Sequence, residues 1–173
     1  FEGVAFIFHG SIAGISTTPA ATLESNQVNA FFGNTAAIGC AGDVNGDGYG
    51  DVIVGADFFA NGESNEGAAF IYHGSPTGIN TVAATMVESN QVNATLGVSV
   101  ASAGDVNGDG FSDVIVGVSG FDNGEANEGA AFVYHGSSTG ISIVVVAIMQ
   151  SNQANAFFGQ SVAGAGDVNA DGY

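Results

Sequence analysis

The sequence has no lysine, no arginine and no tryptophan, and its 17 acidic residues give a formal net charge of −17. A chain without basic side chains cannot neutralise phosphate groups, which excludes nucleic acid as a partner. The single cysteine, Cys40, excludes a disulfide framework, and we interpret it as a small buried side chain. No apolar run reaches the 18 residues that a membrane-spanning helix needs, so no membrane span is predicted.

One glycine- and aspartate-rich stretch occurs three times. It begins at Gly42, Gly104 and Gly166, and in its first copy it is Gly-Asp-Val-Asn-Gly-Asp-Gly-Tyr-Gly-Asp-Val-Ile-Val-Gly. Oxygen-bearing groups fall on alternate residues, and a tight turn directs such groups toward one hard cation. Calcium prefers six to eight oxygen ligands, so we predict calcium loops, two complete and a third incomplete.

The predicted ligands follow one pattern in all three copies. In the first loop they are Asp43, Asn45, Asp47, the carbonyl of Tyr49, and Asp51. In the second loop they are Asp105, Asn107, Asp109, the carbonyl of Phe111, and Asp113. In the third they are Asp167, Asn169, Asp171 and the carbonyl of Tyr173, with no ninth-position aspartate.

These loops differ from an EF-hand, which closes with a glutamate at position twelve and lies between helices. Here position twelve is Val54 or Val116, inside a β-branched run that predicts a buried strand. The alternative is an ordinary turn, because Asp, Asn and Gly are common in turns. Three carboxylates in one small loop repel one another, and a plain turn has little reason to carry that cost repeatedly.

The whole chain repeats with a period of 62 residues, as the positions of Asp43, Asp105 and Asp167 show. Each unit predicts four short strands and no helix, so we predict an all-β chain of about 2.8 repeats, of the kind that forms propeller blades. The predicted strands are 96–103 or 158–165 for strand one; 51–56 or 113–118 for strand two; 68–73, 130–135 or 1–9 for strand three; and 79–87 or 141–149 for strand four.

The dipeptides Phe32-Gly33, Leu96-Gly97 and Phe158-Gly159, each followed by the aspartate loop, resemble FG-GAP repeats. These repeats form the β-propeller of integrin α subunits and of many bacterial secreted proteins, and the His-Gly-Ser turns resemble the bacterial members. The resemblance implies a seven-bladed propeller whose calcium loops join the first two strands of certain blades. We expect a half-blade at 1–30, blades at 31–93 and 94–155, and a half-blade at 156–173, which is an incomplete ring or a segment of a longer propeller.

Two further sets of side chains recur with the repeat. His9, His73 and His135 end strand three, and we interpret them as turn residues rather than as ligands of a transition metal. The acidic loops contain Glu63 with Glu66 and Glu125 with Glu128, which we interpret as solvated hairpin loops rather than a second cation site. Catalytic carboxylate pairs occur once in an enzyme, and this recurrence therefore argues against glycoside hydrolysis.

The sequence thus predicts an extracellular or cell-surface, calcium-binding module with a structural or adhesive role and no catalysis of its own. Its protein or glycan ligand is not specified by the residues. Open blade edges also predict self-association, so a first alternative is a subunit of an extracellular filament or ring. A second alternative is a non-catalytic module of a secreted hydrolase or lyase.

Overall fold

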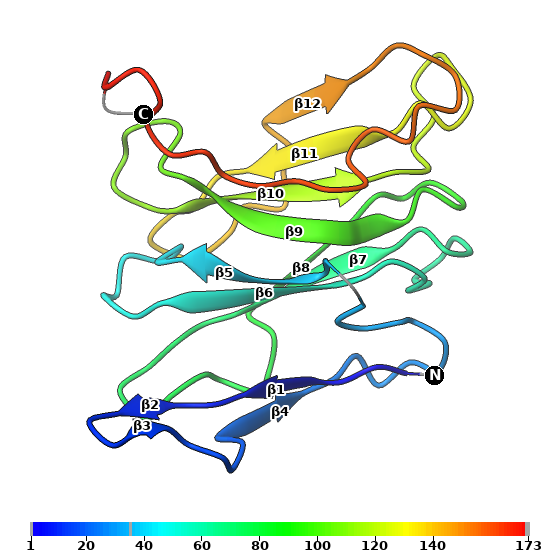
Figure 1. Ribbon diagram of the computed structural model, residues 1–173. Helices are drawn as coiled ribbons and strands as arrows, with labels where there is room; N and C mark the ends of the chain where they lie inside the picture. The colour runs from blue at the N-terminus through cyan, green and yellow to red at the C-terminus, as the bar shows by residue number, and fades with distance from the viewer. Residues whose placement is uncertain (1, 35, 172–173) are drawn as a thin grey trace.

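The computed structural model describes residues 2–34 and 36–171. Twelve β-strands and no helix occur in this part of the chain, and it contains no helical segment long and apolar enough to cross a membrane. Figure 1 shows the strands arranged as sheets that stack one above another. The sheets do not close into a ring, so the predicted all-β architecture of propeller blades is confirmed as an open stack.

The middle sheet is a four-stranded antiparallel meander. It consists of β5 (Ile38–Gly42), β6 (Asp51–Ala56), β7 (Ala68–Tyr72) and β8 (Thr85–Glu88), in that spatial order. The β-branched run in β6 suits this pleated, buried position, and every residue of β7 is buried.

The last sheet repeats the middle one. It consists of β9 (Leu96–Gly104), β10 (Asp113–Val118), β11 (Ala130–Tyr134) and β12 (Ala147–Gln150), again with sequential neighbours paired antiparallel. The first sheet has only β1 (Ala5–Ile7) and β4 (Ala21–Leu23), and the hairpin of β2 (Gly10–Ser11) and β3 (Gly14–Ile15) lies between them in sequence.

Each sheet presents two faces, which we name by their direction along the chain. The forward face of the middle sheet carries Ile53 and Ile71, which share a buried cluster with Val114, Val116 and Tyr134 of the last sheet. Its rear face carries residues that share a second cluster with the first sheet: Val54, Phe70 and Tyr72 from the middle sheet, Ala5 and Leu23 from the first. Hydrophobic cores therefore lie between the sheets: the forward face of the first sheet packs on the rear face of the middle sheet, and the forward face of the middle sheet packs on the rear face of the last.

Glycine sets the distance between neighbouring sheets. A Cβ atom on Gly55 of β6 would overlap the carbonyl oxygen of Gly97, and one on Gly117 of β10 would overlap that of Gly159. Because no side chain fits between the backbones there, these positions require glycine. The Leu96-Gly97 pair thus lies at the contact between the middle and last sheets, and Phe158-Gly159 makes the equivalent contact on the last sheet.

The predicted strands two agree with β6 and β10, residue for residue, whereas three other predictions need correction. Strand four begins only at Thr85 and Ala147, because the chain leaves the sheet after the bond from Asn80 N–H to the His73 carbonyl and returns at Ala84. The segment 158–165 is not a strand, apart from a bridge between Phe158 and Gly129. In the last sheet β9 pairs with β10, whereas no described strand occupies the equivalent position beside 158–165. The predicted strand 1–9 is a strand only over Ala5–Ile7, because its partner β4 is itself three residues long, and residue 1 lies outside the described residues.

Candidate calcium loops

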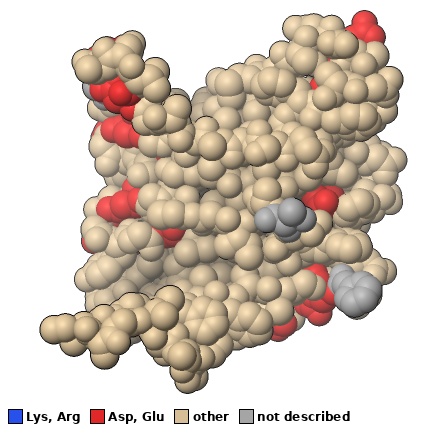
Figure 2. Space-filling view, in the orientation of Figure 1, with Lys and Arg blue, Asp and Glu red and all other residues tan. Residues whose placement is uncertain are grey.

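The first two aspartate-rich loops connect equivalent strands, β5 to β6 and β9 to β10, on the same side of the stack. Figure 2 shows acidic side chains gathered at the two sides of the molecule, where loops join the strands, and few of them across the middle of the view. The first four predicted ligands of each of these two loops therefore lie in one turn at this side of the stack, while the fifth, Asp51 or Asp113, is buried at the start of the following strand.

Asp43 organises the first loop through backbone N–H groups. Its Oδ1 accepts hydrogen bonds from Gly46 at 2.7 Å and Asp47 at 3.1 Å, and its Oδ2 accepts one from Gly48 at 2.8 Å. Positive φ values at Gly46 and Gly48 turn these N–H groups toward one carboxylate. The loop thus holds Asp43 in a single orientation.

Asn45 and Asp47 complete the upper part of this turn. The Asn45 amide donates to Asp47 Oδ2 at 3.0 Å, and Asp47 Oδ1 accepts the Tyr49 N–H at 2.9 Å. This N–H group, followed by the Asn45 amide, lowers the pKa of the Asp47 carboxyl below its ordinary value. Asp47 is therefore held in its charged form, the form that binds a cation.

Asp51 lies below the loop at the start of β6 and is buried. Its Oδ2 accepts the Val44 N–H at 2.9 Å, and its Oδ1 accepts the Gly74 N–H at 2.8 Å. Burial raises the pKa of this carboxyl, while the N–H groups of Gly74 and then Val44 act in the opposite direction. Asp51 fastens the loop to the turn that follows β7.

The second loop reproduces this arrangement. Asp105 accepts the N–H groups of Gly108 at 2.8 Å, Asp109 at 3.1 Å and Gly110 at 2.8 Å, and Asn107 donates to Asp109 at 2.9 Å. Asp113, also buried, accepts the N–H groups of Val106 and Gly136, both at 2.8 Å. The Gly110 N–H is the largest of the causes that lower the pKa of Asp105.

The third loop is described as far as Asp171, and the predicted carbonyl ligand of Tyr173 lies outside the described residues. Asp171 donates its N–H to Asp167 at 3.1 Å, and Asn169 donates to Asp171 at 2.7 Å. The described part of this loop therefore begins with the same bonds as the other two.

The aromatic residues at position seven differ in their surroundings. Tyr49 is 40% exposed, whereas the Phe111 ring packs against Gly46 of the first loop. Ser112 donates its N–H to the Asp43 carbonyl at 2.9 Å, so the two loops touch. A change in one loop can therefore be transmitted to its neighbour.

Calcium fits the donor set by chemistry, because each loop offers carboxylate and amide oxygens held in place by its own N–H groups. Within residues 2–34 and 36–171, however, no group of three or more Asp, Glu, His or Cys side chains is arranged as a metal site. The structure brings Asp43, Asn45 and Asp47 together, and likewise Asp105, Asn107 and Asp109, while Asp51 and Asp113 point to backbone N–H groups below.

The three histidines lie one on each sheet rather than around a common point. The His9 ring packs against Gly78, and the His73 ring packs against Gly140, so each imidazole contacts the turn of the next sheet. His135, half-buried, lines a cavity at the last sheet. This placement agrees with the interpretation of the three histidines as turn residues rather than as ligands of one metal ion.

Two sequence interpretations were wrong about burial. Glu66 and Glu128 are fully buried, and each accepts a backbone N–H through Oε1, from Asn61 and Asn123 respectively, so they are not solvated loop residues. The glycine after each glutamate was the available signal: Gly67 and Gly129 lie against the backbone of Leu96 and Phe158, where no side chain fits. Cys40 of β5 is exposed rather than buried.

Comparison of the sequence with protein families agrees with this geometry. The FG-GAP repeat family matches residues 35–72 and 96–134, which contain both complete loops. The chain is an FG-GAP repeat protein. The matched residues run from before β5 to the end of β7 and from β9 to the end of β11.

Integrin α chains are similar to this FG-GAP protein over most of its length. Mouse integrin alpha-7 is 30% identical over 156 residues, which cover 90% of this chain and 13% of the integrin. Integrin alpha-3 of Cricetulus griseus is 31% identical over 156 residues, covering 87% and 14%. Integrin alpha-4 of Xenopus laevis is 31% identical over 151 residues, covering 85% and 14%. The chain thus spans about a seventh of the length of these relatives.

Proposed function

We propose that this FG-GAP protein is a calcium-binding, extracellular or cell-surface module with a structural or adhesive role and no catalytic activity. The observation that carries the proposal is the repetition of one loop, with the same donors and the same hydrogen bonds, in two successive sheets. Similarity to integrin α chains supports an adhesive role for such a module. The ligand that it would hold is a protein or a glycan.

In this proposal the loop residues named above hold calcium, which supplies positive charge among carboxylates that otherwise repel. The chain's own contribution is orientation, because Asp43 and Asp105 are already fixed by three N–H groups each. With about 1 mM free calcium and a dissociation constant of ~10 μM, each site would stabilise the fold by roughly 2.7 kcal/mol. Such sites would be filled outside cells and nearly empty in a resting cytosol.

Calcium titration by calorimetry, together with thermal unfolding with and without a chelator, tests this function. The wild-type chain should bind at least two calcium ions, and chelation should lower its melting temperature by more than about 10 °C. Asp43→Asn and Asp105→Asn together should remove two sites. Glu24→Gln combined with Glu125→Gln is the matched control, because it also removes two acidic charges, from exposed residues outside the loops.

An unchanged melting temperature after chelation, with no heat of calcium binding, would contradict the proposal. Equal losses in the loop variant and in the double Glu→Gln control would contradict it as well, since the effect would then be one of net charge alone. A ligand search among matrix proteins and glycans, with the loop variant as the negative control, then addresses adhesion.

A further inference from the structure

The sequence contains Asn-Gly dipeptides in two pairs, each pair related by the repeat. Asn45-Gly46 and Asn107-Gly108 lie in the aspartate-rich loops, whereas Asn61-Gly62 and Asn123-Gly124 lie in the turns from β6 to β7 and from β10 to β11. An asparagine loses its amide most readily when glycine follows it, because glycine has no Cβ atom to shield its backbone nitrogen. The two pairs can therefore be compared as sites of this reaction.

The reaction requires the backbone nitrogen of the glycine to reach the side-chain carbonyl carbon of the asparagine. A C–N bond forms between them, the bond from that carbon to Nδ2 breaks, and ammonia leaves with the proton of the glycine nitrogen. Water then opens the cyclic imide at one of its two carbonyls, which gives aspartate or isoaspartate and adds one negative charge. A hydrogen bond that holds the glycine N–H opposes the first step.

The aspartate-rich loops hold both reacting groups. Gly46 donates its N–H to Asp43 Oδ1 at 2.7 Å. The Asn45 side chain donates to Asp47 Oδ2 and accepts the Asp47 N–H, both at 3.0 Å. The second loop repeats these bonds at 2.8, 2.9 and 2.9 Å. Because bonds to a carboxylate are stronger than neutral ones, the glycine nitrogen is kept from attack in both loops.

The other pair leaves the glycine nitrogen without such a bond. Within residues 2–34 and 36–171, the N–H groups of Gly62 and Gly124 have no protein acceptor. Both glycines are exposed, and so are Asn61 and Asn123 before them. Asn61 is exposed although its sheet has a neighbouring sheet on each face, so the exposure is a property of the turn itself.

We propose that Asn61 and Asn123 are modification sites that convert to aspartate and isoaspartate in the folded protein. The asparagines of the aspartate-rich loops keep their amides, because the first aspartate of each loop holds the glycine that follows. This modification goes beyond the proposed function and needs no metal ion. The first aspartate thus protects the neighbouring amide, in addition to the cation binding proposed above.

The two modified sites differ in what the new charge meets. Asn61 Nδ2 donates to Glu88 Oε2 at 2.8 Å, so the product places a second carboxylate against Glu88. Asn123 Nδ2 donates to Gln150 Oε1 at 2.6 Å, and the Gln150 amide can turn its own NH₂ group toward the new carboxylate. Asn61→Asp should therefore lower the melting temperature more than Asn123→Asp, and the reverse order would contradict this step.

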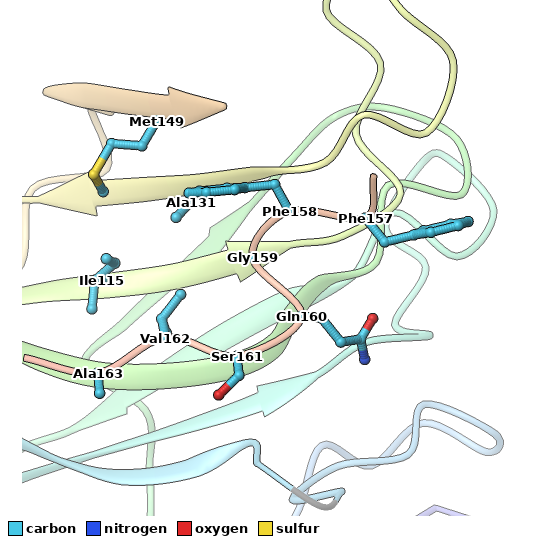
Figure 3. Close-up of a pocket in the computed structure, with 10 residues that line it drawn as sticks. All are labelled: Ile115, Ala131, Met149, Phe157, Phe158, Gly159, Gln160, Ser161, Val162 and Ala163. Carbon is cyan, nitrogen blue, oxygen red and sulfur yellow. The ribbon is translucent and has the colours of Figure 1, made fainter. Parts of the chain in front are cut away.

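Exposure of an amide is not sufficient for the reaction. Figure 3 shows the side chain of Gln160, which is exposed, beside a cavity of about 410 Å³ over the last sheet. A glutamine has to close a larger ring, and Ser161 rather than glycine follows Gln160. Gln160 should therefore keep its amide, and it serves as a reference within the same molecule.

Incubation of the full chain in warm, mildly alkaline buffer with calcium, followed by mass spectrometry of its peptides, tests the proposal. Trypsin cannot cut a chain without lysine or arginine, but chymotrypsin, which cuts after Phe, Tyr and Leu, separates the Asn-Gly dipeptides. Asn61 and Asn123 should deamidate at least about tenfold faster than Asn45 and Asn107, the factor that one hydrogen bond to a charged acceptor provides.

The same chain unfolded in urea is the control for intrinsic reactivity. There the Asn-Gly dipeptides should all react at similar rates, since no loop holds any glycine. Equal rates at all of them in the folded chain would overturn the proposal. So would slow reaction at Asn61 and Asn123 in the folded chain that becomes fast only in urea.

Removing the acceptor tests the cause of the protection. Asp43→Ala frees the Gly46 N–H, so Asn45 should deamidate at least about tenfold faster than in the wild type. Asn107, held by its own loop, is the matched control within the same molecule. An equal rise at both asparagines, or no rise at Asn45, would overturn the role of Asp43. Because the rates are read from peptide masses rather than from a bound ion, the proposal can fail while the calcium function stands.

Discussion

The middle and last sheets share strand order and loop chemistry, but only the middle sheet is covered on both faces. Ile53 of the middle sheet is 0% exposed, while its equivalent in the last sheet, Ile115, is half-buried. The difference arises because a neighbouring sheet lies over Ile53. Much of a residue's burial in this fold thus comes from the next repeat, as in other repeat proteins whose stability is divided between units and interfaces.

The sharpest test of this comparison truncates the same side chain in both sheets. Ile53→Ala should lower the free energy of unfolding by about 3–4 kcal/mol, because it leaves a cavity in a closed interface. Ile115→Ala should cost about 1–2 kcal/mol, because its site is already open to solvent. Urea unfolding of both variants measures the difference, and equal losses would refute the comparison.

The two buried aspartates should behave alike, since both sheets hold them in the same way. Asp51→Ala and Asp113→Ala should each cost about 2–3 kcal/mol, because each leaves two backbone N–H groups without an acceptor. Calcium-free thermal unfolding separates this structural loss from any loss of metal. A cost confined to one of the two variants would show that the loops are not equivalent.

Alkaline titration compares the buried tyrosines of the two sheets. Burial raises the pKa of Tyr72 to about 12 and also raises that of Tyr134. The folded state thus favours the neutral phenol, so this stability is fully present below pH ~10 and is lost as the pH rises toward 12. Absorbance at 295 nm, with Tyr72→Phe and Tyr134→Phe, should show two late-titrating groups, one lost in each variant.

The smallest effect is expected from making the sheets more alike. Cys40 of β5 corresponds to Ser102 of β9, and each side chain accepts the N–H two residues later, from Gly42 and Gly104. Cys40→Ser should therefore change stability by less than about 0.5 kcal/mol. A larger loss in urea unfolding would show a role for the thiol that its exposure does not suggest.

The features that were predictable from sequence depend on local signals. The β-branched runs of β6 and β10 were found with their bounds, and the loop donors were found because alternating oxygens are a local pattern. The late start of β8 was missed, because the chain leaves the sheet between two backbone bonds, from Asn80 to His73 and from Ala84 to Ile71, that the local sequence does not specify. The burial of Glu66 was missed because it depends on how the loop folds around the side chain, whose Oε1 accepts the N–H groups of Asn61 and Glu63. Whether the loop residues converge on a calcium ion remains a prediction.

The glycine contacts between Gly55 and Gly97 and between Gly117 and Gly159 have a consequence for how such genes change. Because both junctions have the same close backbone approach, a unit of 62 residues can be removed or duplicated with each remaining sheet meeting a familiar neighbour. Recombination between repeats would then alter the number of sheets without creating a new kind of junction. Relatives with different numbers of repeats can therefore share one inter-sheet spacing.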